Sequence, residues 1–92
     1  KIYEKIITWT GLRVGVSTIE HSISNLGEFI DYDVTCTNGE DFYRFPVVYY
    51  SGGNTGTFYS TYFILNVNNI RFANNYSWAN YKFKAIIRYT KS

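Results

Sequence analysis

The chain has little of several residue types, and each shortage excludes a class of protein. Its 92 residues contain one cysteine, one proline, one histidine and no methionine. A single cysteine excludes a disulfide-stabilised scaffold and a zinc site built on several thiolates. Apolar runs are only a few residues long, so the sequence contains no candidate membrane-spanning helix. Because the chain begins at Lys1 and lacks methionine, we expect residues 1–92 to be a processed product or a fragment of a longer chain.

Apolar and aromatic residues, by contrast, are abundant. Hydrophobic residues make up 46% of the chain, aromatic residues 21% and charged residues 17%. This composition is too apolar for a disordered chain. Since domains usually hold about 100 to 200 residues, residues 1–92 are expected to form a single domain.

The charges divide unevenly along the chain. Residues 1–41 hold all seven acids and three bases, a net charge of −4, whereas residues 42–92 hold six bases and no acid, a net charge of +6. The bases are spread singly and form no basic run of the kind that binds nucleic acid or heparin. We therefore interpret the two halves as strands that pair with complementary charge across a sheet.

Alternating residue types predict strands along most of the sequence. In residues 30–37 the even positions are apolar and the odd positions polar, and in residues 81–90 the odd positions are apolar or aromatic. β-branched and aromatic residues also predict strands in the segments 1–10, 42–50, 58–67 and 70–72.

Turn residues separate these segments. Asn38-Gly39 predicts a hairpin, and Gly, Asn and Ser predict a loop over residues 51–57 and a turn over residues 74–77. Pro46 lacks a backbone donor, which places its strand at a sheet edge or a bulge. Residues 18–26 fit either a short helix or a strand. Six or seven short strands predict an all-β fold, either a small antiparallel β-sandwich or a small barrel.

Catalytic constellations have little support in the sequence. His21 is the one possible general base, with Ser17, Ser22 or Ser24 as nucleophile and Asp31 to orient it, but no nucleophile-elbow motif is present. A structural hydrogen-bonding role suits a lone histidine better. We predict that the chain is not an enzyme and carries no cofactor.

Two further groups have ordinary structural interpretations. Asp31 and Asp33 share one strand face and resemble a carboxylate pair, although a solvated face is the better explanation. Cys36 shares the apolar face of its strand and is expected to be a small buried residue. No metal site is expected, because the chain lacks a cluster of His, Cys or acidic residues.

Binding of a polar, ring-shaped ligand has more support. Sugars stack their C–H faces on aromatic rings, while planar amides bind their hydroxyl groups. The densest cluster of such side chains lies in the turn after residue 73, and two smaller clusters lie in or beside strands. The predicted ligand-binding residues are Asn74, Asn75, Tyr76, Trp78, Asn80, Tyr49 and Tyr50, with Ser77, Tyr81, Tyr59 and Tyr62 in the same clusters.

Two alternatives to saccharide binding remain open. Lys82, Lys84 and Arg88 share one strand face among aromatic residues, which suggests a barrel that binds single-stranded nucleic acid, although a net charge of +2 is low for that role. The aromatic content and the missing methionine also suit a secreted antimicrobial or membrane-active protein.

Short words in the sequence resemble a known family. The stretch STIEHSISNLGEFIDYDV at residues 17–34 is similar to a recurrent pattern in C-terminal domains of phage tail-fibre and baseplate receptor-binding proteins from Gram-positive hosts. The endings YFILNVNNIRF, NNYSWANY and KFKAIIRYTKS resemble the close of such chains. KIYEKIITWTG resembles their first strand and RFPVVYY a middle strand.

The resemblance implies a β-sandwich or barrel head, usually trimeric, at the end of a longer fibre. Such a head would bind host cell-wall saccharide and would belong to the virion tail, after synthesis in the host cytoplasm. Its partners would be the saccharide, two further copies of the chain and the remainder of the tail or baseplate, without nucleic acid and without membrane insertion. No motif of the family assigns sugar-binding residues by position, so the residues named above come from composition alone.

Overall fold

The computed structural model describes the backbone of residues 1–51 and 57–92 and the side chains of residues 1–48 and 58–92. Within these residues the regular elements are all β-strands, and no helix is long and apolar enough to cross a membrane. The strands are β1 (Tyr3–Thr10), β2 (Gly15–Glu20), β3 (Leu26–Thr37), β4 (Phe42–Arg44), β5 (Val47–Ser51), β6 (Thr57–Leu65), β7 (Asn69–Asn74) and β8 (Lys82–Lys91).

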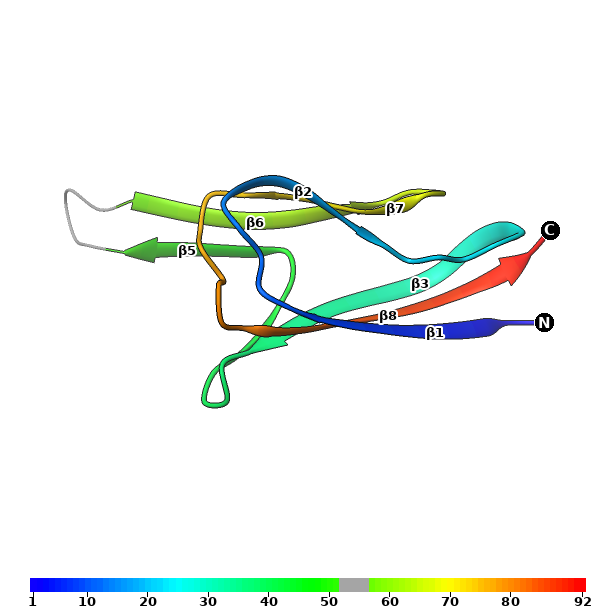
Figure 1. Ribbon diagram of the computed structural model, residues 1–92, viewed down its shortest axis with the longest axis horizontal. Coiled ribbons are helices and arrows are strands. Elements are labelled where there is room, and N and C mark those ends of the chain that lie inside the picture. Colours follow the sequence, from blue (N-terminus) through cyan, green and yellow to red (C-terminus); the bar gives the residue numbers. More distant parts are fainter. Residues whose placement is uncertain (52–56) are drawn as a thin grey trace.

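The strands form two antiparallel four-stranded sheets that pack face to face (Figure 1). The order is β1-β8-β3-β4 in sheet A and β2-β7-β6-β5 in sheet B. The chain is doubled back on itself, because β1 pairs with the last strand and β2 with the one before it. The prediction of an all-β fold is confirmed, and the chain adopts the sandwich.

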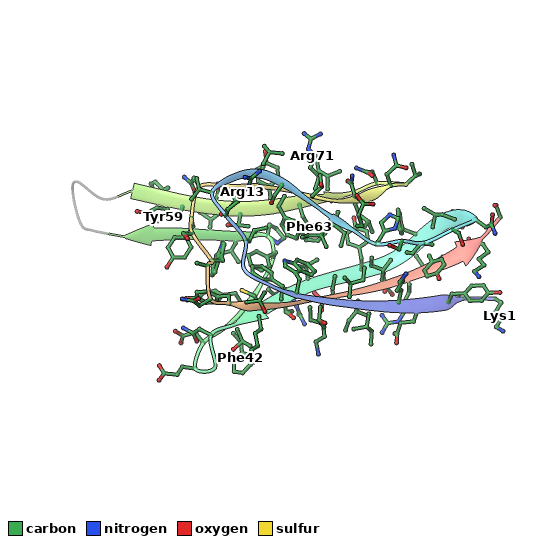
Figure 2. All side chains as sticks on the ribbon, in the orientation of Figure 1. Lys1, Arg13, Phe42, Tyr59, Phe63 and Arg71 are labelled. Carbon is green, nitrogen blue, oxygen red and sulfur yellow. The ribbon has the colours of Figure 1, made fainter. Side chains whose placement is uncertain are left out.

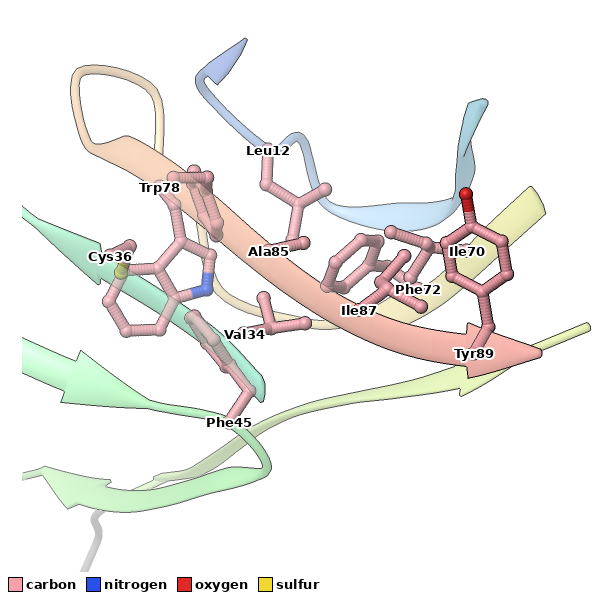
Figure 3. Packing of buried hydrophobic residues seen from close by; sticks show 11 residues of the cluster. Leu12, Val34, Cys36, Phe45, Ile70, Phe72, Trp78, Ala85, Ile87 and Tyr89 are labelled. Atoms are coloured by element: carbon pink, nitrogen blue, oxygen red, sulfur yellow. The ribbon is translucent and has the colours of Figure 1, made fainter. Parts of the chain in front are cut away.

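Both sheets turn one apolar face inward. In β8 the residues Phe83, Ala85, Ile87 and Tyr89 are buried, and the residues between them point outward or lie at the margin. Figure 3 shows these side chains against residues of β7 and of the crossing segments. Aromatic rings join the two sheets, as where Phe72 of β7 meets Phe83 of β8 edge to face with ring centroids 6.4 Å apart. The predicted face of residues 81–90 is therefore confirmed.

The predicted apolar face of residues 30–37 is only partly buried. Val34 and Cys36 are each 2% exposed, but Ile30 and Tyr32 are 45% and 51% exposed. Two register irregularities between Leu26 and Asp31 interrupt the strict alternation of β3. In addition, β4 pairs only with residues 35–37, so the earlier part of β3 is an uncovered sheet edge.

The prediction of one strand over residues 42–50 is wrong. The chain leaves sheet A after Arg44 and enters sheet B at Val47, so β4 and β5 belong to different sheets. Phe45 lies at the crossing, where its ring is buried and its backbone N–H donates to the carbonyl of Val34. The peptide bond between Phe45 and Pro46 is cis. The expectation that Pro46 lies at an edge is confirmed, because β4 and β5 are both outermost strands.

Residues 18–26, which fitted either a helix or a strand, contain no helix. β2 ends at Glu20, and the chain then turns through Ser22 and Asn25, whose φ angles are 55° and 54°. Left-handed backbone at two nearby residues cannot continue a right-handed helix. At the other end, β7 extends to Asn74, so the turn before β8 begins one residue later than predicted.

Candidate functional site

The cluster predicted around Trp78 is a buried structural network. Trp78 is 3% exposed and belongs to the hydrophobic core between the sheets. Its indole ring makes edge contacts with four aromatic rings at centroid distances of 4.7 to 5.4 Å, those of Tyr43, Phe45, Tyr76 and Tyr81. Figure 3 shows the indole nitrogen pointing into the interior, between the labelled core residues. The ring is therefore not an exposed stacking platform.

Hydrogen bonds to the Trp78 indole and to the Asn74 side chain also hold this network together. The indole Nε1–H of Trp78 donates to Thr61 Oγ1 at 2.9 Å, and that hydroxyl donates to Asn74 Oδ1 at 2.5 Å. The Asn74 amide nitrogen donates to the carbonyls of Arg13 and Tyr76, and Asn74 Oδ1 also accepts from the Tyr76 N–H. Every polar atom of the Asn74 side chain is thus engaged within the fold, which is the arrangement that a buried polar group requires.

The other predicted binding residues lie around this network. Asn75 is exposed, but its amide accepts from the Ser60 N–H at 2.7 Å and donates to the Phe58 carbonyl at 3.1 Å, so it extends the pairing of β6. Tyr76 is half-buried against Trp78, and Asn80 is exposed in the following turn. Tyr49 and Tyr50 belong to β5, and their side chains lie outside the described residues.

A small cavity opens beside these rings. It is lined by Tyr43, Val47, Tyr59, Thr61, Tyr76 and Trp78 and has a volume of about 50 Å³. This volume holds a few water molecules and is far below the roughly 300 to 1,000 Å³ of sites that enclose small ligands. A saccharide ring therefore does not fit between the two sheets at this end.

His21 has a structural role. The side chain is 1% exposed, and its Nδ1 accepts a hydrogen bond from the Ile23 N–H at 3.1 Å. Its Nε2 therefore carries the proton and donates to the Asn66 carbonyl at 2.8 Å. Both ring nitrogens hold loops together, and neither is directed at a serine hydroxyl or at Asp31.

The two aspartates and the cysteine also have structural roles. Asp31 Oδ1 lies 2.8 Å from Arg88 Nη1, and Asp33 Oδ1 lies 3.1 Å from Arg44 Nε. Cys36 is buried, and burial raises the pKa of its thiol to about 12. Among the residues with described side chains, no group of three or more His, Cys, Asp or Glu is arranged to hold a metal ion.

A larger hollow than the cavity beside Trp78 lies on the outer face of sheet A. It has a volume of about 650 Å³ and is open to solvent. We call it the threonine–lysine trough; its outward-facing side chains are those of Thr8, Thr10, Thr35, Thr37, Phe42, Lys82 and Lys84. Phe42 is 79% exposed at the edge of the trough and projects from the lower side of the sandwich in Figure 2.

Strand pairing arranges this trough in two rows. In one row Lys84 of β8 lies between Thr8 of β1 and Thr35 of β3, and in the other Lys82 lies between Thr10 and Thr37. The second row continues to Phe42, the partner of Thr37 on β4. Neighbouring strands are about 4.8 Å apart, and the two rows are separated by about 6.5 to 7 Å along the strands. Each lysine therefore has a threonine on both sides.

Charge separates the trough from the rest of this face. Toward the other end of β8, Arg88 bonds to both Asp31 and Glu4 at 2.8 and 3.0 Å. The hydrogen bond and charge of Asp31, followed by the charge of Glu4, raise the pKa of the Arg88 guanidinium. Lys82 and Lys84 have no ion-pair partner among residues 1–48 and 58–92. Both cations of the trough are thus available to a ligand.

Sequence reasoning missed the trough, although it noted Lys82 and Lys84. The available signal is a set of three polar–apolar–polar triplets, Thr8-Trp9-Thr10, Thr35-Cys36-Thr37 and Lys82-Phe83-Lys84. Each triplet buries its middle residue, at least in part, and exposes the outer two. The sequence does not reveal the register of the strands, and it is this register that places the three triplets side by side.

No protein-family model matches this chain, and comparisons with curated proteins and with solved structures give no significant match. The function is therefore argued from the geometry of the trough.

Proposed function

We propose that this chain is a non-enzymatic recognition domain that binds a cell-surface or cell-wall saccharide, as the receptor-binding head of a phage tail protein would. The observation that supports it is the threonine–lysine trough. Hydroxyl groups and ammonium groups face solvent there in a regular pattern, with one exposed aromatic ring at the edge. A saccharide presents the complementary groups, because its hydroxyls exchange hydrogen bonds with threonine and its C–H face stacks on an aromatic ring.

The trough is suited to binding because it lies on a rigid surface. Its threonine and lysine side chains project from three neighbouring strands, β1, β8 and β3, and the alternate residues of those strands form part of the core or pack against it. The hydroxyls of Thr8, Thr10 and Thr35 have no hydrogen-bond partner among the side chains and backbone that the structure describes. The Thr37 hydroxyl, in contrast, donates to the Asp41 carbonyl and accepts from the Gly39 N–H. Three hydroxyls therefore remain available to a ligand, and stacking on Phe42 replaces the stacking expected of Trp78.

Homo-oligomerisation, as a trimer, is the second part of the proposal. The outer face of sheet B carries exposed apolar side chains, with Val16 58%, Val48 74%, Tyr62 50% and Ile64 50% exposed. Exposed apolar patches of this kind commonly mark protein–protein contacts. A symmetric assembly through sheet B would leave the trough on sheet A open in every copy, and several weak sites would then act together.

A pull-down with purified Gram-positive cell-wall polysaccharide tests the binding. We expect the wild type to be retained, and Phe42→Ala to be retained more weakly. Val67→Ala is the matched control, because Val67 is also an exposed apolar residue, 67% exposed, in the turn between β6 and β7. Absence of retention for the wild type, or equal retention for all three proteins, would reject the trough as the saccharide site.

Light scattering tests the assembly. A trimer has three times the chain mass of 10.7 kDa. Replacing both Tyr62 and Ile64 by lysine should reduce the mass to that of one chain, since two charges would then be buried in the contact. A wild type that scatters as a single chain contradicts the trimer and leaves the binding site to be judged separately.

A further inference from the structure

We infer that the saccharide bound in the threonine–lysine trough is anionic, with sulfate, phosphate or carboxylate groups that lie one over each Thr–Lys–Thr row. This inference rests on the proposed saccharide-binding function and specifies its ligand. It follows from the charge of Lys82 and Lys84 and from the spacing between them. Binding of a neutral sugar would require neither feature.

The first step concerns the free lysines. Each exposed arginine on the outer face of sheet A has a carboxylate partner: Arg44 bonds to Asp33, and Arg88 to Asp31 and Glu4. Lys82 and Lys84 lie on the same face of the central strand and lack such a partner in the described part of the chain. Two unneutralised cations in one open hollow attract an anion and gain little from a neutral sugar.

The nearby acids do not neutralise this pair. Glu40 and Asp41 lie in the turn between β3 and β4 and do not line the trough. Their backbone N–H groups donate to Asn38 Oδ1 at 2.9 and 2.8 Å, which holds the turn in a compact form. Asp41 directly precedes Phe42 in the chain, so the acids of this turn are on the side of the trough where Phe42 lies and not beside Lys84. An anionic ligand therefore lies along β8, over the lysines and between the threonines.

The second step concerns spacing. Lys82 and Lys84 are two residues apart on one strand, so their Cα atoms are separated by about 6.5 to 7 Å. Each lysine has a threonine on both neighbouring strands, at about 4.8 Å. An ammonium flanked by hydroxyls supplies several donors to the oxygens of one anionic group. Two such donor sets, one around each lysine, would suit a linear polymer that carries an anionic group at regular intervals.

The third step selects a saccharide over a nucleic acid. Channels for single-stranded nucleic acid combine a basic groove with several aromatic rings on which successive bases stack. Phe42 is the one aromatic side chain that faces outward in the trough, because Trp9 and Phe83, which also line it, pack on the core. The other outward-facing side chains beside the two lysines are those of four threonines. These features favour an anionic glycan, and a nucleic acid becomes one outcome of the test.

The test is calorimetric titration of the chain with four probes: dextran, dextran sulfate, inorganic polyphosphate and oligodeoxythymidylate. Lys82→Gln/Lys84→Gln removes the two charges of the trough. Arg13→Gln/Lys91→Gln is the matched control, since it removes the same charge from exposed residues that belong neither to the trough nor to the outer face of sheet B. Amide chemical shifts recorded during the titration locate the bound probe on sheet A or elsewhere.

We expect dextran sulfate to bind more tightly than dextran and to shift the amides of β1, β3 and β8. The lysine double variant should lose affinity for dextran sulfate by about 2- to 30-fold, as two exposed ion pairs would give, and the control double variant should keep it. The preference for dextran sulfate should also shrink between low and physiological salt.

Other results overturn the inference in distinguishable ways. Equal affinity for dextran and dextran sulfate, unchanged in the lysine variant, rejects the anionic ligand and leaves saccharide binding intact. Polyphosphate or oligodeoxythymidylate bound as tightly as dextran sulfate rejects the saccharide and indicates a site that reads charge alone. Equal losses in both double variants reject the trough as the location. Absence of binding to every probe rejects this inference, and failure to bind cell-wall polysaccharide as well rejects the proposed function.

Discussion

Trp78 and Phe42 illustrate two regions of the molecule that composition alone makes similar. Both rings stand near asparagine, tyrosine and turn residues, yet Trp78 is 3% exposed and Phe42 is 79% exposed. Around Trp78 the polar side chains bond to one another and close the gap between the sheets. Around Phe42 the polar side chains lie in rows on a sheet and face solvent. A cluster of amides and rings is therefore informative about binding only after its hydrogen bonds have been assigned.

The largest effect that separates the two regions is expected for Trp78→Ala. Removal of the buried ring leaves a cavity and removes the N–H group that donates to the Thr61 hydroxyl, so the free energy of unfolding should fall by about 3 to 5 kcal/mol. Urea denaturation followed by circular dichroism measures this change. Trp78→Phe keeps part of the packing and serves as the milder control. A loss below about 1 kcal/mol for Trp78→Ala would mean that the network is not part of the stable core.

A smaller effect is expected for Asn74→Ala in the same network. The substitution leaves the Thr61 hydroxyl and the carbonyls of Arg13 and Tyr76 without their partner, which should cost about 1 to 3 kcal/mol. Asn75→Ala is the matched control, because that amide is exposed and water can replace it. The same urea experiment should therefore rank Asn74→Ala well above Asn75→Ala. Equal losses at the two positions would contradict the distinction between a buried network and an exposed cap.

The strands differ in how far the sequence alone predicts them. The strand rhythm of residues 81–90 was sufficient to predict β8 and its buried face, because alternation along one strand is local information. The break at residues 45 and 46 was not predictable in the same way. It depends on the burial of Phe45 against the opposite sheet, which is a tertiary contact.

The site was harder to predict for the same physical reason. An asparagine amide can bind a sugar hydroxyl or a backbone carbonyl equally well, so the type of residue at position 74 does not decide between them. The trough, in turn, joins residues from β1, β3 and β8, of which Thr8 and Lys84 are 76 positions apart in the sequence and yet lie side by side. Its rows exist only in the observed register, and a shift of one residue would turn them toward the core.

Cys36 extends the comparison because its strand takes part in both regions. In β3, Thr35 and Thr37 face the trough, and Cys36 between them belongs to the buried core. Burial raises its thiol pKa to about 12, above the ordinary value of 9.0, so the folded state holds the proton more tightly than the unfolded state. Its contribution to stability should be constant below pH 9.0 and should fall progressively toward pH 12. The difference in urea midpoint between wild type and Cys36→Ala, measured from pH 8 to pH 11, isolates this contribution from that of the tyrosines. A difference that does not change with pH would place the thiol on the solvent side.

The smallest effect on stability is expected for Phe42→Ala, the exposed counterpart of Trp78→Ala. Because the ring lies on the outside of an edge strand, its removal should change the free energy of unfolding by no more than about 0.5 kcal/mol. Stacking on a saccharide is the one contact proposed for this ring, so the affinity for the cell-wall polysaccharide should fall by about 2- to 10-fold. Denaturation and binding are therefore expected to respond in opposite order to the two substitutions. A Phe42→Ala protein that loses stability but keeps its affinity would show that this ring, like that of Trp78, serves the fold.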